Sequence, residues 1–162
     1  MSTRKPTRPS HALTPPVEGP ASIDAICRER GMALTRVRRA TLDALRKRDG
    51  PVGAYEVMKD LSVALGRKIS PPTVYRALQA LATHGLIARI ESRNAFLARE
   101  EPQRPPSGVF YLCVNCGSAT EVMDEVVERR VERDARQLHF KVARQVHEVE
   151  GTCEGCQAKP KA

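Results

Sequence analysis

The stretch SPPTVYRALQALATHG, residues 70–85, predicts a helix with one buried side and one exposed side. Ser70 is a suitable N-cap, and the two prolines after it fit the first turn, where backbone amides have no partner within the helix. Gly85 is a natural helix stop. The apolar residues that recur at helical spacing form the buried side: Val74, Ala77, Leu78 and Leu81.

The opposite side of this helix carries polar side chains that suit DNA. Arg76 can form two hydrogen bonds to one guanine in the major groove, and Tyr75 offers its ring to thymine methyl groups and its hydroxyl to phosphate. The candidate DNA contacts on this helix are Thr73, Tyr75, Arg76 and Gln79. A helix-turn-helix used only for protein contact is the alternative interpretation.

The flanking segments complete a winged helix-turn-helix. Downstream, LIARIE (86–91) and AFLAR (95–99) are strand patterns joined by SRN, which predicts a hairpin. Upstream, helical patterns cover about residues 21–31, the stretch after the N-cap candidate Thr35, and about residues 54–65. Short helices followed by a hairpin are typical of this DNA-binding module, which we expect over residues 21–99.

The net charge of +8 lies in the amino-terminal half of the 162-residue chain. Residues 1–90 hold 16 Lys and Arg against 7 Asp and Glu, whereas residues 91–162 hold 11 against 12. A basic half joined to a nearly neutral half predicts a module for a polyanion beside a module with another task. Five basic residues are candidates for phosphate contacts: Arg36, Arg38, Arg39, Lys68 and Arg89.

Two cysteine pairs predict a metal site. Cys113 and Cys116 form one C-x₂-C step, Cys153 and Cys156 form the other, and 36 residues separate them. One such step brings two thiolates to a single ion, and two steps complete a tetrahedron of sulfur, which favours one structural Zn²⁺ per protomer. An iron–sulfur cluster or a redox dithiol is the alternative. Cys27 stands alone and fits a buried apolar position.

The second half predicts a small α/β domain. The strand VFYLC (109–113) leads to the first cysteine pair, and a strand at about 119–123 leads to a helix that opens at Asp124. The stretch FKVARQVHEVEG (140–151) alternates and predicts a strand that delivers the chain to the second pair. The helix carries a narrow apolar stripe of Val127, Val131, Ala135 and Leu138. The fold class is therefore α+β, with this zinc-stapled domain at residues 108–157.

The remaining segments connect or extend these domains. Residues 1–20 contain five prolines and predict a disordered basic arm, residues 100–107 predict a linker, and residues 158–162 predict a tail. We expect a cytoplasmic protein without a membrane partner, because no secretory signal and no apolar run of about 20 residues is visible. We expect neither enzyme activity nor a small-molecule substrate, because a closed Cys₄ site has no open coordination position.

Four stretches resemble the ferric uptake regulator family: GMALTRVRRATLDAL, PPTVYRALQALATHGLI, YLCVNCG and GTCEGC, in this order over roughly residues 22–156. The stretches GAYEVM, KISPPTVYRAL and RIESRNAFL look most like its zinc uptake regulator branch. The resemblance implies a homodimeric repressor that binds an operator in double-stranded DNA and controls zinc uptake genes. It also implies that the four cysteines hold structural zinc and that Tyr55, Tyr75 and Arg76 contact DNA.

The chain departs from this family at the second, regulatory metal site. In the zinc branch the ligands are a His in the wing, a Cys just after it, and a His and a Glu around the first cysteine pair. Those places hold Ala88, Arg99, Pro106 and Glu121, so that only the carboxylate remains. Arg99 brings a permanent positive charge instead.

Few residues remain that could bind a second metal ion. Glu121 and His147 are the candidates for a residual regulatory site, and the sequence gives little support to a second zinc. Two alternatives to a zinc-responsive repressor therefore stay open. One is a regulator with structural zinc that responds to another signal, and the other is a zinc-stabilised adaptor that binds protein.

Overall fold

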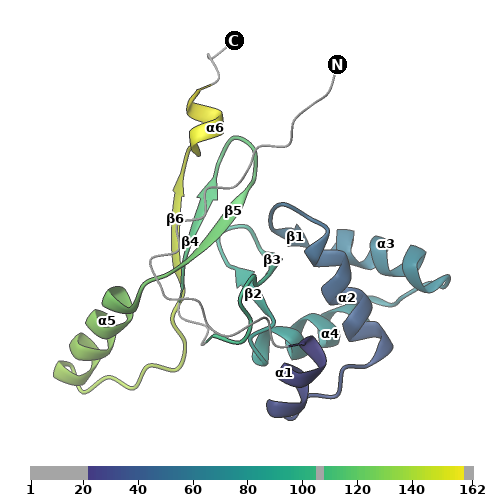
Figure 1. Ribbon diagram of the computed structural model, residues 1–162, viewed down its shortest axis with the longest axis horizontal. Coiled ribbons are helices and arrows are strands. Elements are labelled where there is room, and N and C mark those ends of the chain that lie inside the picture. The colour runs from purple at the N-terminus through teal and green to yellow at the C-terminus, as the bar shows by residue number, and fades with distance from the viewer. Residues whose placement is uncertain (1–21, 105–107, 159–162) are drawn as a thin grey trace.

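Two three-stranded sheets organise the computed structural model, which describes residues 22–104 and 108–158 (Figure 1). The arm predicted at residues 1–20 lies outside the described residues, as does the tail except for Ala158. None of the helices among the described residues is long and apolar enough to cross a membrane.

The first part of the fold packs four helices on a small sheet. The helices are α1 (Ile23–Glu29), α2 (Arg36–Arg46), α3 (Ala54–Leu65) and α4 (Pro71–Thr83). The strands are β1 (Val52–Gly53), β2 (Ile87–Ile90) and β3 (Ala95–Ala98), in the antiparallel order β1-β3-β2. The hairpin of β2 and β3 is the predicted wing, and the two-residue strand β1 was not predicted.

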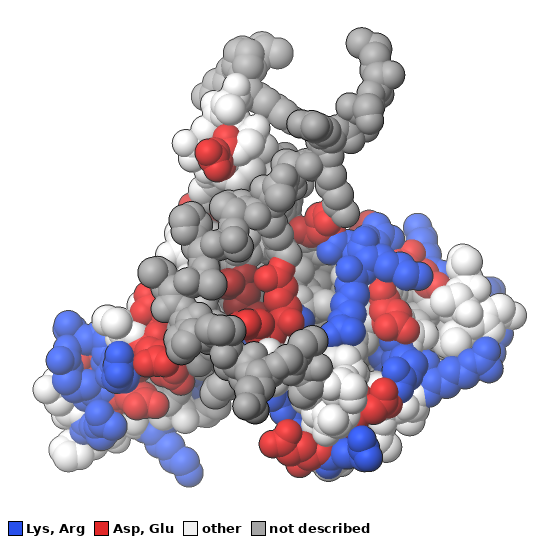
Figure 2. Space-filling view, viewed as in Figure 1, with Lys and Arg blue, Asp and Glu red and all other residues white. Residues whose placement is uncertain are grey.

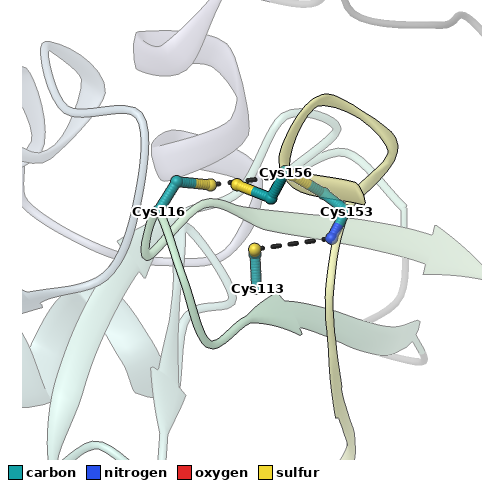
Figure 3. Close-up of side chains that lie close together, drawn as sticks. All are labelled: Cys113, Cys116, Cys153 and Cys156. Carbon is teal, nitrogen blue, oxygen red and sulfur yellow. Dashed lines mark hydrogen bonds between the residues drawn. The ribbon is translucent and has the colours of Figure 1, made fainter. Parts of the chain in front are cut away.

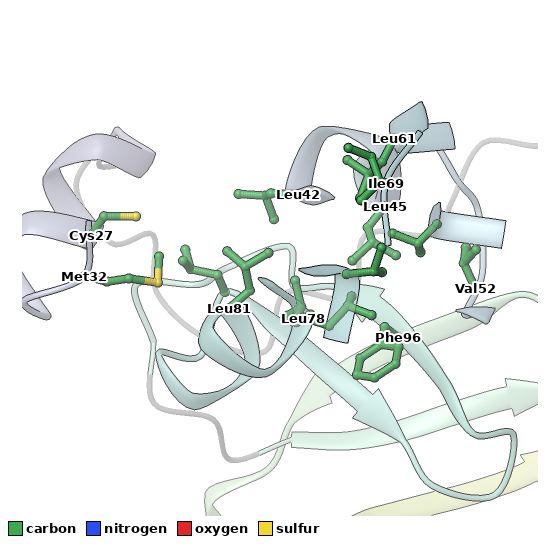
Figure 4. Packing of buried hydrophobic residues seen from close by; sticks show 14 of the residues in the cluster. Cys27, Met32, Leu42, Leu45, Val52, Leu61, Ile69, Leu78, Leu81 and Phe96 are labelled. Carbon is green, nitrogen blue, oxygen red and sulfur yellow. The ribbon is translucent and has the colours of Figure 1, made fainter. Parts of the chain in front are cut away.

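An aliphatic core holds this first part together (Figure 4). Leu42 and Leu45 of α2, Leu61 of α3, and Leu78 and Leu81 of α4 are each at most 2% exposed. Burying one such side chain contributes about 1.5–3 kcal/mol. Cys27 belongs to the same cluster and is 1% exposed, and this burial raises the pKa of its thiol.

The helix starts follow the predicted caps with one difference. The side chain of Thr35 accepts a hydrogen bond from the backbone amide of Arg38 and so caps α2. At α4, the Ser70 Oγ atom lies 2.9 Å from the Thr73 Oγ1 atom, and no backbone amide of the helix bonds to the Ser70 side chain. The prolines at the first two positions of α4 lower the number of amides that need a cap.

The second part of the fold is a mixed sheet. Strand β4 (Gly108–Cys113) lies in the centre, antiparallel to β5 (Ala119–Met123) and parallel to β6 (His147–Gly151). The crossover from β5 to β6 contains α5 (Glu125–Gln137), capped by the Asp124 side chain as predicted. The short helix α6 (Glu154–Gln157) follows β6.

The strand predicted at residues 140–151 was wrong in its first half, because only His147–Gly151 pairs with β4. The stretch before it begins as the end of α5. His139 adopts a left-handed backbone with φ of 51°, and the amide of Phe140 bonds the carbonyl of Ala135 at 2.8 Å. This turn closes the helix, so the predicted strand start is a helix C-terminus.

The apolar stripe predicted on α5 has no full cover among the residues that the structure describes. Val127, Val131 and Ala135 are only half-buried, Leu138 is 76% exposed, and no residue of α5 is buried. An amphipathic helix that covers no core within its own chain leaves an apolar face available for another surface.

The two sheets share a second, smaller core. Ile90 and Leu97 of the wing pack with Phe110, Leu112 and Ala119 of the second sheet. Figure 2 shows Lys and Arg spread over the helical first part and over α5, with acidic residues gathered between them. The first part is therefore seated on the second sheet through its wing.

Candidate nucleic-acid interface and metal centre

The outer side of α4 is exposed as predicted. Val74 and Leu78 anchor the helix at 1% exposure or less, while Tyr75 is 57% exposed and Arg76 and Gln79 are also exposed. Thr73 is half-buried beside Ser70. The buried anchors fix the helix, so its polar side chains project from a rigid element, which suits the reading of base edges.

The other candidate DNA contacts lie on α2 and α3 and before α4. Tyr55 is 65% exposed near the start of α3, with the Lys59 ammonium 4.7 Å from its ring centre. Arg36 and Lys68 are exposed, and within the described residues no carboxylate pairs with either. Both are therefore available to phosphate without breaking an ion pair.

Arg38 and Arg39 have partners in this structure. Arg38 donates a 2.6 Å hydrogen bond to the carbonyl of Ala33, and Arg39 forms an ion pair with Asp24. A phosphate contact by Arg39 has to compete with this exposed ion pair. Exposed pairs are weak, typically below about 1 kcal/mol, so the competition costs little.

The structure brings the four predicted metal ligands together (Figure 3). Cys113 ends β4 and Cys116 lies in the turn after it, while Cys153 and Cys156 come from the start and the body of α6. Their sulfur atoms all lie within 4.8 Å of one another, and the Sγ atoms of Cys116 and Cys153 are 3.7 Å apart. Gly117, with φ of 77°, completes the first turn in a conformation that favours glycine.

This sulfur cage fits zinc. Tetrahedral Zn–S bonds of about 2.3 Å place the sulfur atoms about 3.8 Å apart, close to the distance between Cys116 and Cys153. Backbone amides already point at the cage, since the amide of Cys153 lies 3.4 Å from the Sγ atom of Cys113. Four thiolates with no open position form a closed structural site.

The pKa values of the thiols diverge within the cage. Hydrogen bonds from the backbone amides of Cys116 and Cys153 lower the pKa of Cys113 to about 5. The hydrogen bond with Cys153, then burial, raise the pKa of Cys156 to about 12. Ser118, whose hydroxyl lies 3.1 Å from the Cys116 Sγ atom, lowers the pKa of Cys116. Crowded thiols cannot all ionise without a cation, which is what a bound Zn²⁺ supplies.

The turn that carries the first cysteine pair also touches the first part of the fold. Arg93, between the wing strands, donates hydrogen bonds to the carbonyls of Cys113 at 2.9 Å and Gly117 at 3.2 Å. A Cβ atom at Gly50 would lie 2.5 Å from the Gly117 carbonyl oxygen, so only glycine fits there. Nothing in the sequence pattern singled out Arg93 or Gly50.

The two candidates for a residual regulatory site are not brought together. In the sheet register Glu121 lies opposite Phe110, which pairs with Glu148, whereas His147 pairs with Val109, which lies opposite Val122. Paired residues share a face and neighbours along a strand alternate, so Glu121 and His147 point to opposite faces. Among the described residues, the only cluster of three or more possible metal ligands is the four cysteines.

Glu121 instead forms an ion pair with Arg99, the residue that follows the wing. The Nε atom of Arg99 donates to the Glu121 carboxylate at 2.9 Å, and the two side chains are 1% and 8% exposed. Burial raises the pKa of Glu121, and the charge of Arg99 opposes that rise. Glu121, which the sequence indicates as a candidate regulatory ligand, is thus engaged in a buried ion pair.

These features define a class of protein. A winged helix-turn-helix is followed by a mixed α/β part with a four-cysteine centre, which is the architecture of a zinc-binding transcription regulator. The chain belongs to the ferric uptake regulator family, whose family model matches residues 29–150. Members of this family are DNA-binding transcription regulators and not enzymes.

Relatives on both the zinc and the iron side are similar to this chain. The zinc uptake regulation protein of Escherichia coli strain K12 is 31% identical over 137 residues, covering 84% of this chain and 80% of the relative. That of Mycobacterium tuberculosis is 30% identical over 131 residues, covering 79% and 97%. The ferric uptake regulation protein of Legionella pneumophila is 29% identical over 131 residues, covering 80% and 95%.

Two solved structures share the fold closely. A zinc uptake regulator in complex with zinc and DNA matches with a TM-score of 0.78 at 30% identity, over 83% of this chain and 89% of that one. The holo form of the regulator XcZur matches with a TM-score of 0.73 at 37% identity, over 83% and 93%.

Proposed function

We propose that this protein is a homodimeric repressor that binds operator DNA and controls genes of zinc homeostasis. The observation that carries the proposal is the exposed polar side of α4, presented on a winged core. A regulator with the same fold and 30% identity has been captured with zinc and DNA. In this proposal the base edges are read by Arg76, Tyr75, Thr73 and Gln79. The DNA phosphates, which fix the orientation of the protein on the duplex, are contacted by Tyr55, Arg36, Arg38, Arg39 and Lys68.

The proposed division of labour follows the two cores. Residues 21–99 form the DNA-reading domain, residues 100–107 the linker, and residues 108–157 the dimerisation domain. The larger core supports this division, because all of its buried residues lie between Ile26 and Phe96. The smaller core joins the wing to the second sheet, so that the two proposed domains are in direct contact.

A second copy of the chain is the proposed cover for the open face of the second sheet. Tyr111 and Val149 are direct neighbours on that face and are 49% and 45% exposed, and Val122 adds to it at 38%. The uncovered stripe of α5 adds further apolar area. Dimers of DNA-binding proteins place two reading helices on one operator, which multiplies affinity and sets the half-site spacing.

The experiment combines DNA selection, metal analysis and titration. The wild-type protein selects duplexes from a random pool, and its affinity for the enriched duplex is measured at several salt concentrations and over a range of free zinc. We expect about one zinc per protomer and a steep loss of affinity with salt. If no duplex is enriched, or if the affinity does not change with salt concentration, the repressor hypothesis is contradicted and the protein-binding adaptor is favoured.

A regulator whose only zinc is structural is the second candidate, and one observation favours it. The buried ion pair of Arg99 and Glu121 stands where the zinc branch has regulatory ligands. The same titration separates the two candidates. A zinc-responsive repressor gains affinity as free zinc rises above the level that fills the four cysteines, whereas the second candidate does not.

A further inference from the structure

Arg99 lies where three segments of the chain meet. Its Nε atom bonds both carboxylate oxygens of Glu121 on β5, at 2.9 and 3.3 Å. Its Nη1 atom donates to the carbonyl of Gly85, at 3.3 Å, and to that of Arg104, at 3.1 Å. One buried side chain therefore ties together the turn after α4, the segment after β3 and the second sheet.

A second arginine donates hydrogen bonds to the same turn. Arg30, just after α1, donates to the carbonyls of His84 and Pro102. The carbonyls of His84 and Gly85 follow directly after α4, where the helix dipole is negative and a cation is favourable. Two guanidinium groups thus fix the end of the proposed reading helix to the segment that leads to the second sheet.

The positive charge of Arg99 is balanced by a carboxylate and by backbone carbonyl oxygens. A buried cation is costly unless it is paired and hydrogen-bonded, and Arg99 has both a carboxylate and two carbonyl oxygens. The planar guanidinium reaches these acceptors at once because its donors form a rigid fork. A lysine carries the same charge on a single nitrogen and cannot match this geometry.

A divalent metal does not fit this junction. A metal ion needs several donor atoms, and among the described residues no group of three or more His, Cys, Asp or Glu ligands gathers at this junction. The guanidinium of Arg99 already bonds both oxygens of the Glu121 carboxylate. The other regulatory positions of the zinc branch that can be compared, Ala88 and Arg99 itself, have no group that can bind a cation.

We propose that Arg99 is a positioning residue for DNA recognition, a built-in cation that sets the orientation of α4 relative to the second sheet. The operator affinity is therefore independent of any metal ion at this junction and depends on zinc only through the four cysteines. This inference rests on the proposed DNA-binding function in its second form, the regulator whose only zinc is structural, and its test has a readout that does not need DNA.

The test uses the full-length, zinc-loaded protein and three variants: Arg99→Met, Arg99→Lys and Glu121→Gln. Val57→Ala, in the core of α3 at 0% exposure, is the control for a general loss of stability. The first readout is amide hydrogen exchange without DNA, at residues 84–87 and 121–123. We expect faster exchange in both segments for Arg99→Met, and an intermediate effect for Arg99→Lys.

The second readout is affinity for the duplex selected by the wild-type protein, with free zinc buffered from chelated to excess. We expect wild-type affinity to be flat once the four cysteines are filled, and Arg99→Met to bind about tenfold more weakly with an unchanged zinc content. Val57→Ala should keep wild-type affinity below its unfolding temperature. Glu121→Gln should show the same pattern as Arg99→Met if the latter does not fold.

Three outcomes overturn the proposal. They are wild-type affinity that rises with free zinc beyond the filled cysteines, exchange at the two segments that does not change in the variants, and equal loss of affinity in Val57→Ala. Failure of the wild-type protein to select any duplex speaks against the repressor itself. In that case the exchange readout still tests whether Arg99 joins the two parts.

Discussion

The guanidinium of Arg93, in the turn of the wing, donates a 2.9 Å hydrogen bond to the backbone carbonyl of Cys113, the first ligand of the metal centre. A second bond reaches the carbonyl of Gly117 in the same turn. The cage and the wing therefore share a contact although 20 residues separate Arg93 from Cys113. This side chain therefore joins the cysteine turn to the wing directly.

Arg93→Ala should loosen the cysteine turn without removing a ligand. Losing two hydrogen bonds from a charged donor costs about 1.5–3 kcal/mol each at most, and less here because Arg93 keeps partial access to water. We expect faster transfer of zinc to a chelator and a lower unfolding temperature. Arg129→Ala, which removes an exposed arginine of α5, is the control, and equal zinc release from the two variants would contradict the coupling.

Arg76→Ala should weaken specific DNA binding and leave the fold intact. The side chain is exposed and contributes nothing to the core, so the expected loss is about 1–3 kcal/mol of binding free energy for the selected duplex. Footprinting and a binding titration measure it, with size and zinc content as checks. Arg133→Ala on α5 removes the same charge elsewhere. An unchanged footprint for Arg76→Ala would remove α4 from the reading of bases.

Cys113→Ser should lose zinc and unfold the second sheet, because metal binding to four thiolates is coupled to the folding of this part. Metal analysis and hydrogen exchange of β4 and β6 measure the effect. Cys27→Ala is the matched control, since its thiol lies in the aliphatic core and is not one of the four clustered cysteines. A zinc-free Cys113→Ser protein with protected β4 amides would show that the metal does not hold this sheet.

Glu148 makes the contact of the second sheet with the wing sensitive to acid. Its carboxylate accepts hydrogen bonds from the amides of Glu91, at 2.6 Å, and Ser92, at 3.1 Å. Burial acts to raise the pKa of Glu148, but these bonds and the charge of Arg93 hold it below its ordinary value. Folding therefore favours the ionised form, and its contribution is present above the ordinary glutamate pKa of about 4.3.

The stabilising effect of Glu148 should be lost as the pH falls through its lowered folded-state pKa. A carboxyl ¹³C titration of the folded protein measures this value directly. Glu148→Gln should lower the free energy of unfolding at neutral pH, and this difference should shrink in acid. Glu56→Gln, an exposed site on α3, is the control. A normal or raised pKa for Glu148 would contradict the hydrogen-bonded arrangement.

Val149→Asp should produce monomers if the open face of the second sheet is the dimer interface. The substitution places a charge at the centre of an apolar surface, next to Tyr111, and a buried unpaired charge is strongly unfavourable. Sedimentation measures the mass. Val63→Asp changes an equally exposed type of residue, 84% exposed on α3, and should stay dimeric. A dimeric Val149→Asp protein would move the interface elsewhere.

Helix α4 and the cluster of four cysteines could be predicted from the sequence because their signals are local. The capping residues, prolines and apolar spacing of residues 70–85 act within a few turns of one helix. The C-x₂-C steps each form one turn, and the structure confirms that the two turns meet. Thiolate chemistry allows few other uses for such pairs.

The errors and omissions arise from long-range contacts. The strand predicted at residues 140–146 has a fitting alternation, but whether a strand forms depends on a partner, and β4 is paired with β6 only from Val109 onward. Arg99 is recognisable as an unusual residue in the sequence, yet its pairing with Glu121 depends on how the two sheets sit against each other. The face to which Glu121 and His147 point also follows only from the register.

The buried contact between Arg99 and Glu121 has a consequence for how the protein can receive information. The effect of a dissociable ion on a conformational equilibrium grows with the concentration of that ion. The guanidinium of Arg99 is covalently attached and cannot dissociate, so the charge at this position is the same when the cell is poor in metal ions and when it is rich in them. At this junction the positive charge is therefore always present, and its effect on the two parts does not change with the concentration of metal ions.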